Sequence, residues 1–218
     1  ALLLFLFCFP GNNLAAENEV YIIEISGSIN PAVADFLKKG INKASGDGVS
    51  CIIIKIDTPG GLAESMRKIV MAIFASKVPV VTYVAPSGAR AASAGVMITI
   101  AADIAAMAPG TNIGAAHPVG AGGKDIGGKM SEKVTNDMVA YVKSIAQKRG
   151  RNVKWVEKAV RESVSVTETE ALKANVIDIV AKDLDDLIRQ INGRKIENKG
   201  VLKLDNPKKT MIEESLRT

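Results

Sequence analysis

The sequence predicts one α/β domain in which parallel strands alternate with helices. Runs of mostly apolar residues at 20–25, 51–56 and 79–84 have the length of buried strands. Between them, residues 32–39 and 62–76 carry apolar side chains at helical spacing. This alternation is typical of βαβ units whose parallel sheet is covered on both faces. A chain of 218 residues is long enough for one domain with a substantial core and short for two.

The first predicted unit has clear punctuation. Its strand at 20–25 ends at Ser26-Gly27-Ser28, and Pro31 suits the first turn of the helix that follows. Gly40 is expected to weaken this helix before Ser45-Gly46-Asp47-Gly48 ends it.

The second half continues the alternation. Thr167 and Glu170 have the spacing of a capping box at the start of a helix. The glycine-rich segment 117–128 is expected to be a mobile loop, and such loops often lie over functional sites. The remaining predicted elements are a helix at 91–101, a strand at 104–108, a polar helix from about 133 to 149, a strand at 176–180 and a helix at 184–191.

Residues 1–16 form a separate, signal-peptide-like leader. Nine apolar residues are followed by the break Pro10-Gly11, and Leu14-Ala15-Ala16 offers small side chains for cleavage. The apolar run is shorter than the roughly 20 residues needed to span a bilayer. An apolar strand or core helix at the terminus is the alternative. Because of the signal-like features, we expect export from the cytoplasm.

The other end of the chain differs in composition from the predicted domain. We expect the folded domain to occupy residues 17–192. Residues 193–218 are rich in Lys, Asn and Asp, with only weak alternation of apolar side chains. We expect them to be a linker or extension toward a membrane part.

Composition argues against several functions. The net charge is +5, but basic and acidic residues are interspersed and only 4% of residues are aromatic, so nucleic-acid binding is not expected. Cys8 lies in the leader and Cys51 in a predicted buried strand, so neither a disulfide nor a zinc site is expected. His117 is the only histidine, which excludes a histidine-rich metal site. We expect no metal and no cofactor.

The segment Asp57-Thr58-Pro59-Gly60-Gly61 lies between a buried strand and a helix. A tight Gly-Gly turn there leaves backbone N–H groups free, and such groups suit a developing oxyanion or a phosphate. Taken alone, a Pro-Gly-Gly sequence is usually only a turn.

A second segment, Ala91-Ala92-Ser93-Ala94-Gly95, places a serine among small residues at the start of a helix. A substrate carbonyl would fit beside the Ser93 hydroxyl, close to the amide of Ala94. The alternative is a helix cap, or a small residue where two helices cross.

A serine nucleophile needs a base, and the residues alone leave two kinds open. One is His117. The other is a lysine whose pKa is lowered by burial, because desolvation disfavours the ammonium form. Most lysines are solvated surface residues, and nothing local shows that one of these is buried. The candidates are Lys124, Lys129, Lys133, Lys143 and Lys148.

Four segments together resemble one known family. They are residues 57–61, 91–95, Met107-Ala-Pro-Gly-Thr-Asn-Ile-Gly-Ala-Ala116 and Lys133-Val-Thr-Asn-Asp137. In this order and spacing they resemble the N-terminal protease domain of the NfeD family, the stomatin-operon partner proteins, from about residue 20 to residue 192. That family is related in fold to the Clp protease and to bacterial signal peptide peptidase. The resemblance implies a Clp/crotonase-like fold of repeated ββα/βαβ units.

The resemblance also implies a Ser-Lys dyad, a known variant of the catalytic triad. The family's serine falls on Ser93 as nucleophile, and its lysine falls on Lys133 as general base. The oxyanion donors would be the amides of Gly61 and Ala94, with Gly60 shaping the turn. A Ser93–His117 pair is the rival mechanism, because Clp-like peptidases keep their catalytic histidine near this position. Asp178 is a candidate to orient His117, chosen only for its place beside a strand.

Substrates and partners follow from the same resemblance. The expected protein is a membrane-associated serine endopeptidase that cleaves apolar peptide segments and acts on a stomatin-like membrane protein. Its protease domain would lie on the extracytoplasmic side, as a homodimer or higher oligomer.

Two alternatives belong to other classes. One is a non-catalytic scaffold partner of stomatin- or flotillin-like proteins. The other is a crotonase-type acyl-CoA enzyme, which would need a general-base carboxylate. Only Asp57 and Asp103 lie near suitable segments, and export argues against an acyl-CoA substrate.

Overall fold

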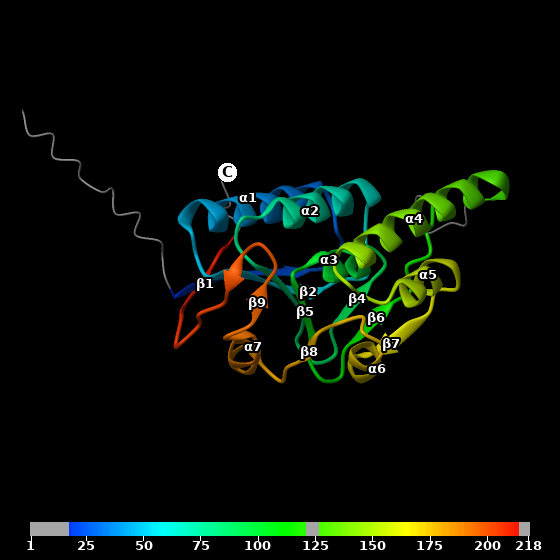
Figure 1. The fold of residues 1–218 in the computed structure, drawn as a ribbon. Helices are drawn as coiled ribbons and strands as arrows, with labels where there is room; N and C mark the ends of the chain where they lie inside the picture. The colour runs from blue at the N-terminus through cyan, green and yellow to red at the C-terminus, as the bar shows by residue number, and fades with distance from the viewer. Residues whose placement is uncertain (1–17, 121–126, 214–218) are drawn as a thin grey trace, which may run out of the picture.

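The centre of this computed structural model, which describes residues 18–120 and 127–213, is a parallel sheet (Figure 1). Its strands are β1 (Glu19–Ser26), β2 (Cys51–Asp57), β3 (Val80–Val84), β5 (Ile104–Met107), β8 (Ile179–Val180) and β11 (Lys208–Met211). They lie in the order β11-β1-β2-β3-β5-β8, and all five pairings are parallel. The predicted strands at 20–25, 51–56, 79–84 and 104–108 are confirmed within one or two residues.

The composition of β2 shows why these segments are strands. Its side chains are buried almost without interruption, as expected of a parallel strand covered on both sides. Ile52, Ile54 and Ile56 face one core cluster, whereas Cys51 and Ile53 face the other. The β-branched residues therefore supply packing on both faces of the sheet.

Helices α1 (Pro31–Asp47), α2 (Ala63–Ala75) and α3 (Ala94–Ala101) cover the first face, and α7 (Leu184–Ile191) covers the second (Figure 1). Helix α1 begins after Asn30, whose side chain accepts the Val33 N–H at 3.0 Å, and ends at Gly48 in a left-handed conformation. Gly40 does not end the helix. A Cβ there would lie 2.1 Å from Ile23 Cδ1, so Gly40 is where α1 approaches β1 closely.

A small second sheet lies beside the first. It contains β4 (Arg90–Ala92), β6 (Asn112–Gly114) and β7 (Ser165–Thr167), in that order. The predicted helix at 91–101 is therefore shorter than expected, since its first residues belong to β4 and α3 begins only at Ala94. The predicted capping box is confirmed at the start of α6 (Glu168–Lys173).

Helix α4 (Gly128–Lys148) begins earlier than predicted and packs on α5 (Val153–Arg161). One face of its second half is buried, through Met138, Val139 and Val142 among others. Its first turns are exposed, and 60% of Met130 is accessible to solvent. This end of α4 extends beyond the body of the domain in Figure 1.

Residues 193–213 differ from the linker expected for this part of the chain. They form a hairpin of β9 (Lys195–Ile196) and β10 (Gly200–Val201), followed by β11, which pairs with β1. Leu202 and Leu204 are each 3% exposed and belong to the second core cluster. These strands are too short to show a pattern, and their burial depends on partners far away in the sequence. The predicted leader at 1–16 lies outside the described residues, as do residues 121–126 of the predicted loop.

Candidate active site

Ser93 occupies the sharp turn between β4 and α3. Its φ of 52° and ψ of −115° are uncommon for a residue with a side chain. Such a conformation persists only where its surroundings hold it, and it is frequent at active sites. Here the Ser93 N–H donates to Gly114 O at 3.1 Å, and Ser93 O accepts the Val96 N–H at 2.9 Å. Both ends of the serine's backbone are therefore held in place.

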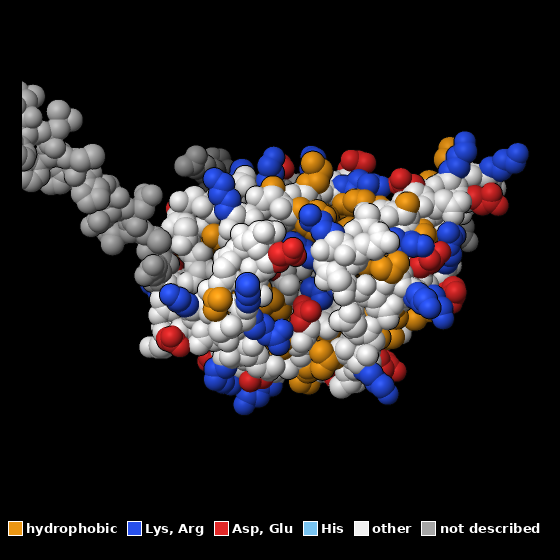
Figure 2. All heavy atoms as spheres, viewed as in Figure 1, with side chains coloured by type: hydrophobic (Ala, Val, Ile, Leu, Met, Phe, Trp, Pro, Cys, Tyr) orange, Lys and Arg blue, Asp and Glu red, His pale blue; other side chains and the backbone are white. Residues whose placement is uncertain are grey.

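Ser93 lines a cavity of about 730 Å³. The other lining residues come from the segment after β1, the segment around residues 59–63, helices α2, α3 and α4, and the segment after β6. They are mostly apolar: Ser28, Pro59, Gly61, Leu62, Ala63, Met66, Ala94, Met97, Ala115, Ala116, His117, Pro118, Val119, Gly120, Val134 and Met138. Figure 2 shows hydrophobic side chains gathered between α2 and α4, the two helices that supply Met66 and Met138.

Gly60 and Gly61 are packed too closely for any side chain. A Cβ on Gly60, whose φ is +116°, would lie 2.6 Å from the Cβ of Ser93. A Cβ on Gly61 would lie 2.1 Å from Ile29 O. Both positions therefore require glycine. Because neither residue has a side chain, the turn can lie directly against the serine.

Hydrogen bonds fix this turn and leave one donor free. Gly60 O accepts the Ile29 N–H and Ile29 O accepts the Leu62 N–H, both at 2.8 Å. In such a parallel bridge the N–H of the intervening Gly61 points away from Ile29. Within residues 18–120 and 127–213 this N–H has no hydrogen-bond partner.

A second free donor lies next to the serine. Ala94 is the first residue of α3, where backbone N–H groups have no partner inside the helix. No side chain caps this helix. Since Ala94 and Gly61 line the same cavity as Ser93, the structure brings together these three residues. Two free N–H groups beside a serine hydroxyl are suited to stabilise an oxyanion.

His117 also lines this cavity and is half-buried. Its Nδ1 lies 3.0 Å from Val160 O. A carbonyl can only accept, so Nδ1 carries the proton in this contact and Nε2 is left as an acceptor when the ring is neutral. Asp178 does not orient His117 in this structure, because its carboxylate accepts the Ala105 N–H at 2.7 Å and pairs with Arg151 at 2.8 Å.

Lys133 is not brought to Ser93. It is exposed on α4 and is not among the residues that line the cavity. The next residue, Val134, does line it, together with Met138 one turn later. Successive residues of a helix point about 100° apart. Lys133 therefore lies beside the cavity-facing side of α4 without being on it.

Besides packing on α5 and α3, α4 contacts α2 through the Arg67 side chain. The Arg67 guanidinium pairs with Asp137 at 2.5 Å and lies 4.1 Å from the centre of the Tyr141 ring. Burial raises the pKa of Tyr141, and the charge of Arg67 opposes this rise. The phenol is thus neutral, and its ring face meets the cation.

The apolar lining of the cavity was missed by the sequence analysis. Met66, Met97 and Met138 come from three different helices. Only Met66 carried a signal, as part of the apolar face of the helix predicted at 62–76. The other two meet it only through the tertiary fold.

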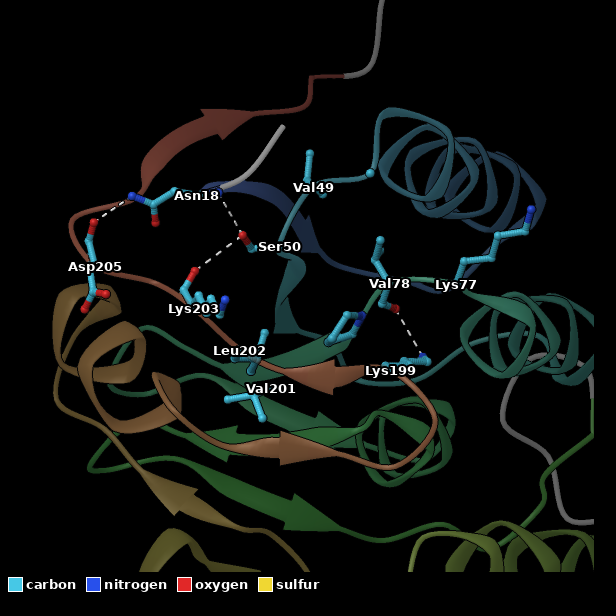
Figure 3. A pocket seen from close by; sticks show the side chains of 12 residues that line it. Asn18, Val49, Ser50, Lys77, Val78, Lys199, Val201, Leu202, Lys203 and Asp205 are labelled. Carbon is cyan, nitrogen blue, oxygen red and sulfur yellow. Dashed lines mark hydrogen bonds between the residues drawn. The ribbon is translucent and has the colours of Figure 1, made fainter. Parts of the chain in front are cut away.

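A second cavity, of about 550 Å³, lies at the opposite end of the sheet, where β2 and β3 begin (Figure 3). Its polar groups bind mainly to the backbone. Ser50 Oγ accepts the Asn18 N–H at 3.1 Å, and Lys199 Nζ donates to Val78 O at 3.1 Å and to Asp103 at 2.7 Å. The two Lys199 bonds join the C-terminal segment to the sheet. We therefore interpret this cavity as a structural feature, the junction between the C-terminal segment and the sheet.

In residues 18–120 and 127–213, no three His, Cys, Asp or Glu side chains are grouped so that they could hold a metal ion. None of the helices within these ranges is both long and apolar enough to cross a membrane.

The fold and the arrangement around Ser93 define a Clp-like α/β domain with a candidate serine nucleophile. Residues 19–215 match the family described as NfeD1b, N-terminal domain, and the chain belongs to this family. It is 43% identical over 190 residues to the "Membrane-bound protease PH1510" of Pyrococcus horikoshii. That match covers 86% of this chain but only 43% of the relative.

Solved structures agree with this assignment. A structure titled as a 1510-N membrane-bound stomatin-specific protease, a lysine-to-alanine mutant in complex with a substrate peptide, superposes with a TM-score of 0.85 and 39% identity. The match covers 92% of this chain and 94% of that one. A serine-to-alanine mutant of 1510-N superposes with a TM-score of 0.84 at 39% identity, covering 91% and 99% of the two chains. ClpP1 of Listeria monocytogenes, at 23% identity, shares the fold with a TM-score of 0.62 over 76% of this chain and 94% of its own.

Proposed function

We propose that this chain is the peptidase domain of a membrane-associated serine endopeptidase. The observation that carries the proposal is the strained Ser93, which lines an apolar cavity together with the free N–H groups of Gly61 and Ala94. The names of the relatives support it, because both a serine and a lysine were replaced in a stomatin-specific protease of the same fold.

In the proposed reaction, Ser93 Oγ attacks a peptide carbonyl while the neutral amine of Lys133 takes the hydroxyl proton. The carbonyl oxygen becomes an oxyanion that accepts from Gly61 and Ala94. The C–N bond then breaks, the leaving amine takes the proton from Lys133, and Ser93 remains acylated. A water molecule, deprotonated by Lys133, attacks this ester. The bond to Ser93 Oγ then breaks, Ser93 takes the proton back from Lys133, and the acid is released.

This mechanism requires a movement of α4. Lys133 is exposed in the structure and must turn toward the cavity, which its neighbour Val134 already lines. The exposed first turns of α4 have few contacts that oppose such a rotation.

The lining of the cavity supports an apolar peptide as substrate. Met66, Met97 and Met138 are flexible and polarisable, so they adapt to different apolar side chains. We propose a stomatin-like membrane protein as the source of this peptide. We also propose that the domain is exported behind its leader, acts on the extracytoplasmic side and self-associates. The proposed chemistry needs no cofactor.

One observation favours a second mechanism on the same fold. His117 lines the cavity with Ser93, and its Nε2 is left as an acceptor. A Ser93–His117 pair would therefore need no movement of α4. Val160 O would take the place of the carboxylate that usually orients such a histidine.

The test compares five purified proteins on a panel of apolar peptides: the wild type and the Ser93→Ala, Lys133→Ala, Lys129→Ala and His117→Ala variants. Lys129 is the matched control, being an exposed lysine one turn earlier on α4. We expect Ser93→Ala to abolish cleavage and Lys133→Ala to lower kcat about 10²- to 10⁴-fold, the usual contribution of a general base. Lys129→Ala and His117→Ala should retain most activity.

The opposite pattern of activities would contradict the Ser93–Lys133 dyad. An inactive His117→Ala variant beside an active Lys133→Ala variant would establish the histidine mechanism. A fluorophosphonate probe tests the serine independently of peptide choice. If the probe labels neither the wild type nor any variant, and no peptide is cleaved, the enzyme proposal fails and the scaffold role takes its place.

A further inference from the structure

Thr58 lies at the end of β2, directly before the Pro59-Gly60-Gly61 turn, and its side chain is completely buried. A hydroxyl in such a place needs hydrogen-bond partners. Its two shortest hydrogen bonds are of opposite kind, and Gly60 O lies at 3.2 Å as a second possible acceptor. Thr58 Oγ1 donates to Gly27 O at 2.6 Å and accepts the Gly60 N–H at 3.0 Å.

These two bonds fix the peptide that precedes the free donor of Gly61. The Gly60 N–H is used by Thr58, and Gly60 O is used by the Ile29 N–H at 2.8 Å. Gly60 is thus held at both its donor and its acceptor. Its N–H is not available to a substrate, whereas the N–H of Gly61 remains free and its direction is set.

The methyl group of Thr58 contacts the other half of the site. A Cβ added to Gly95 would lie only 2.7 Å from Thr58 Cγ2, so this methyl packs directly on the backbone of α3, one residue after Ala94. The Thr58 backbone also pairs with β4. Its N–H donates to Arg90 O at 2.8 Å, and its carbonyl accepts the Ala92 N–H at 3.0 Å, one residue before Ser93.

We propose that Thr58 is the positioning residue of the oxyanion hole. Its hydroxyl fixes the turn that carries the Gly61 N–H, and its methyl fixes the start of the helix that carries the Ala94 N–H. One buried side chain therefore sets the separation of the two donors. This inference rests on the proposed peptidase function. Thr58 itself touches neither the substrate nor Ser93 Oγ in this role.

The physical consequence is specific to the transition state. Donors stabilise an oxyanion only when they lie at hydrogen-bond distance from the position that the oxygen reaches after attack. A small displacement of either donor therefore lowers kcat, whereas the binding of the uncleaved peptide, which uses the apolar lining, is little affected.

The experiment compares Thr58→Val and Thr58→Ser with the control Thr82→Val. Valine keeps the shape of threonine and removes the hydroxyl, whereas serine keeps the hydroxyl and removes the methyl. Thr82 is a matched control, because it is also fully buried and its hydroxyl donates to one carbonyl, Thr99 O at 3.1 Å, away from the cavity lining.

We expect Thr58→Val to lower kcat about 10- to 100-fold with KM changed by less than about twofold, part of the effect of removing one oxyanion donor. Thr58→Ser should lose only several-fold, and Thr82→Val should keep the wild-type kcat even if it melts earlier. A peptide aldehyde, which forms an oxyanion on Ser93, should bind Thr58→Val correspondingly more weakly. The matching peptide alcohol should bind all variants alike.

Two results would overturn the inference. One is a Thr58→Val variant with the wild-type kcat. The other is equal loss of aldehyde and alcohol binding, which would indicate only a structural role. If Thr58→Val does not fold, Thr58→Ser decides in its place: an unchanged kcat and aldehyde affinity would contradict the proposed role of the methyl. Failure of the peptidase proposal is distinct, because the wild type would then cleave nothing and bind aldehyde and alcohol equally.

Discussion

The two walls of the Ser93 cavity are built in different ways. The serine wall, residues 58–61 and 93–95, consists of backbone packed so closely that Gly60, Gly61 and Gly95 leave no room for a Cβ. The α4 wall, residues 130–138, is a helix whose first turns are exposed. The proposed nucleophile and oxyanion donors therefore lie on closely packed backbone, whereas the proposed base lies on the exposed part of a helix. In the proposed mechanism only the α4 wall has to move.

The largest effect is expected from Gly60→Ala in the serine wall. The new Cβ would collide with that of Ser93, so the turn or the serine must move, and kcat should fall at least about 100-fold. The positive φ adds about 1–2 kcal/mol of strain. Gly88→Ala is the matched control, since Gly88 has a φ of +90° and nothing within 4 Å of its Cβ position. If both variants lose activity equally, crowding is not what fixes this wall.

A smaller effect is expected from Arg67→Ala, which loosens the α4 wall. The variant loses the ion pair with Asp137 and the contact with the Tyr141 ring. Since exposed pairs contribute about 0–1 kcal/mol, the free energy of unfolding should change little, while kcat/KM changes several-fold. Lys68→Ala, next on the same helix and exposed, should leave kcat/KM unchanged. Hydrogen exchange of the α4 amides would show whether the helix has become more mobile.

The smallest effect on activity is expected from Lys199→Met, at the other end of the sheet. Lys199 pairs with the buried Asp103, which Arg149 also contacts at 2.6 Å. Losing one partner of this buried carboxylate should reduce the free energy of unfolding by about 1–3 kcal/mol. Peptide cleavage below the melting temperature should match the wild type. Lys195→Met, which replaces an exposed lysine of the same hairpin, should change neither quantity. A loss of cleavage by Lys199→Met would contradict this expectation and would link this junction to the active site.

The sequence predicted the serine wall better than the α4 wall. The apolar run at 51–56 and the Pro-Gly-Gly segment after it are local patterns, and each was found where the structure has it. Gly40 was interpreted as a weak point of α1, because the sequence does not show that Ile23 lies against it. The position of Lys133 relative to the cavity depends on the rotation of α4, which its packing on α5 and α3 fixes and which no local pattern shows. The three-residue strands of the small sheet are too short for any periodicity to predict.

The pairing of β11 with β1 moves the edge of the sheet from an apolar strand to one that carries two lysines. Residues 208–211 form hydrogen bonds along β1 and cover a backbone edge that β1 would otherwise expose. Uncovered edges of this kind recruit strands from other molecules. Shortening the chain to end before Lys208 would leave β1 open along Glu19–Ile22, which is rich in strand-forming residues, and the shortened domain should form β-sheet aggregates from otherwise folded molecules.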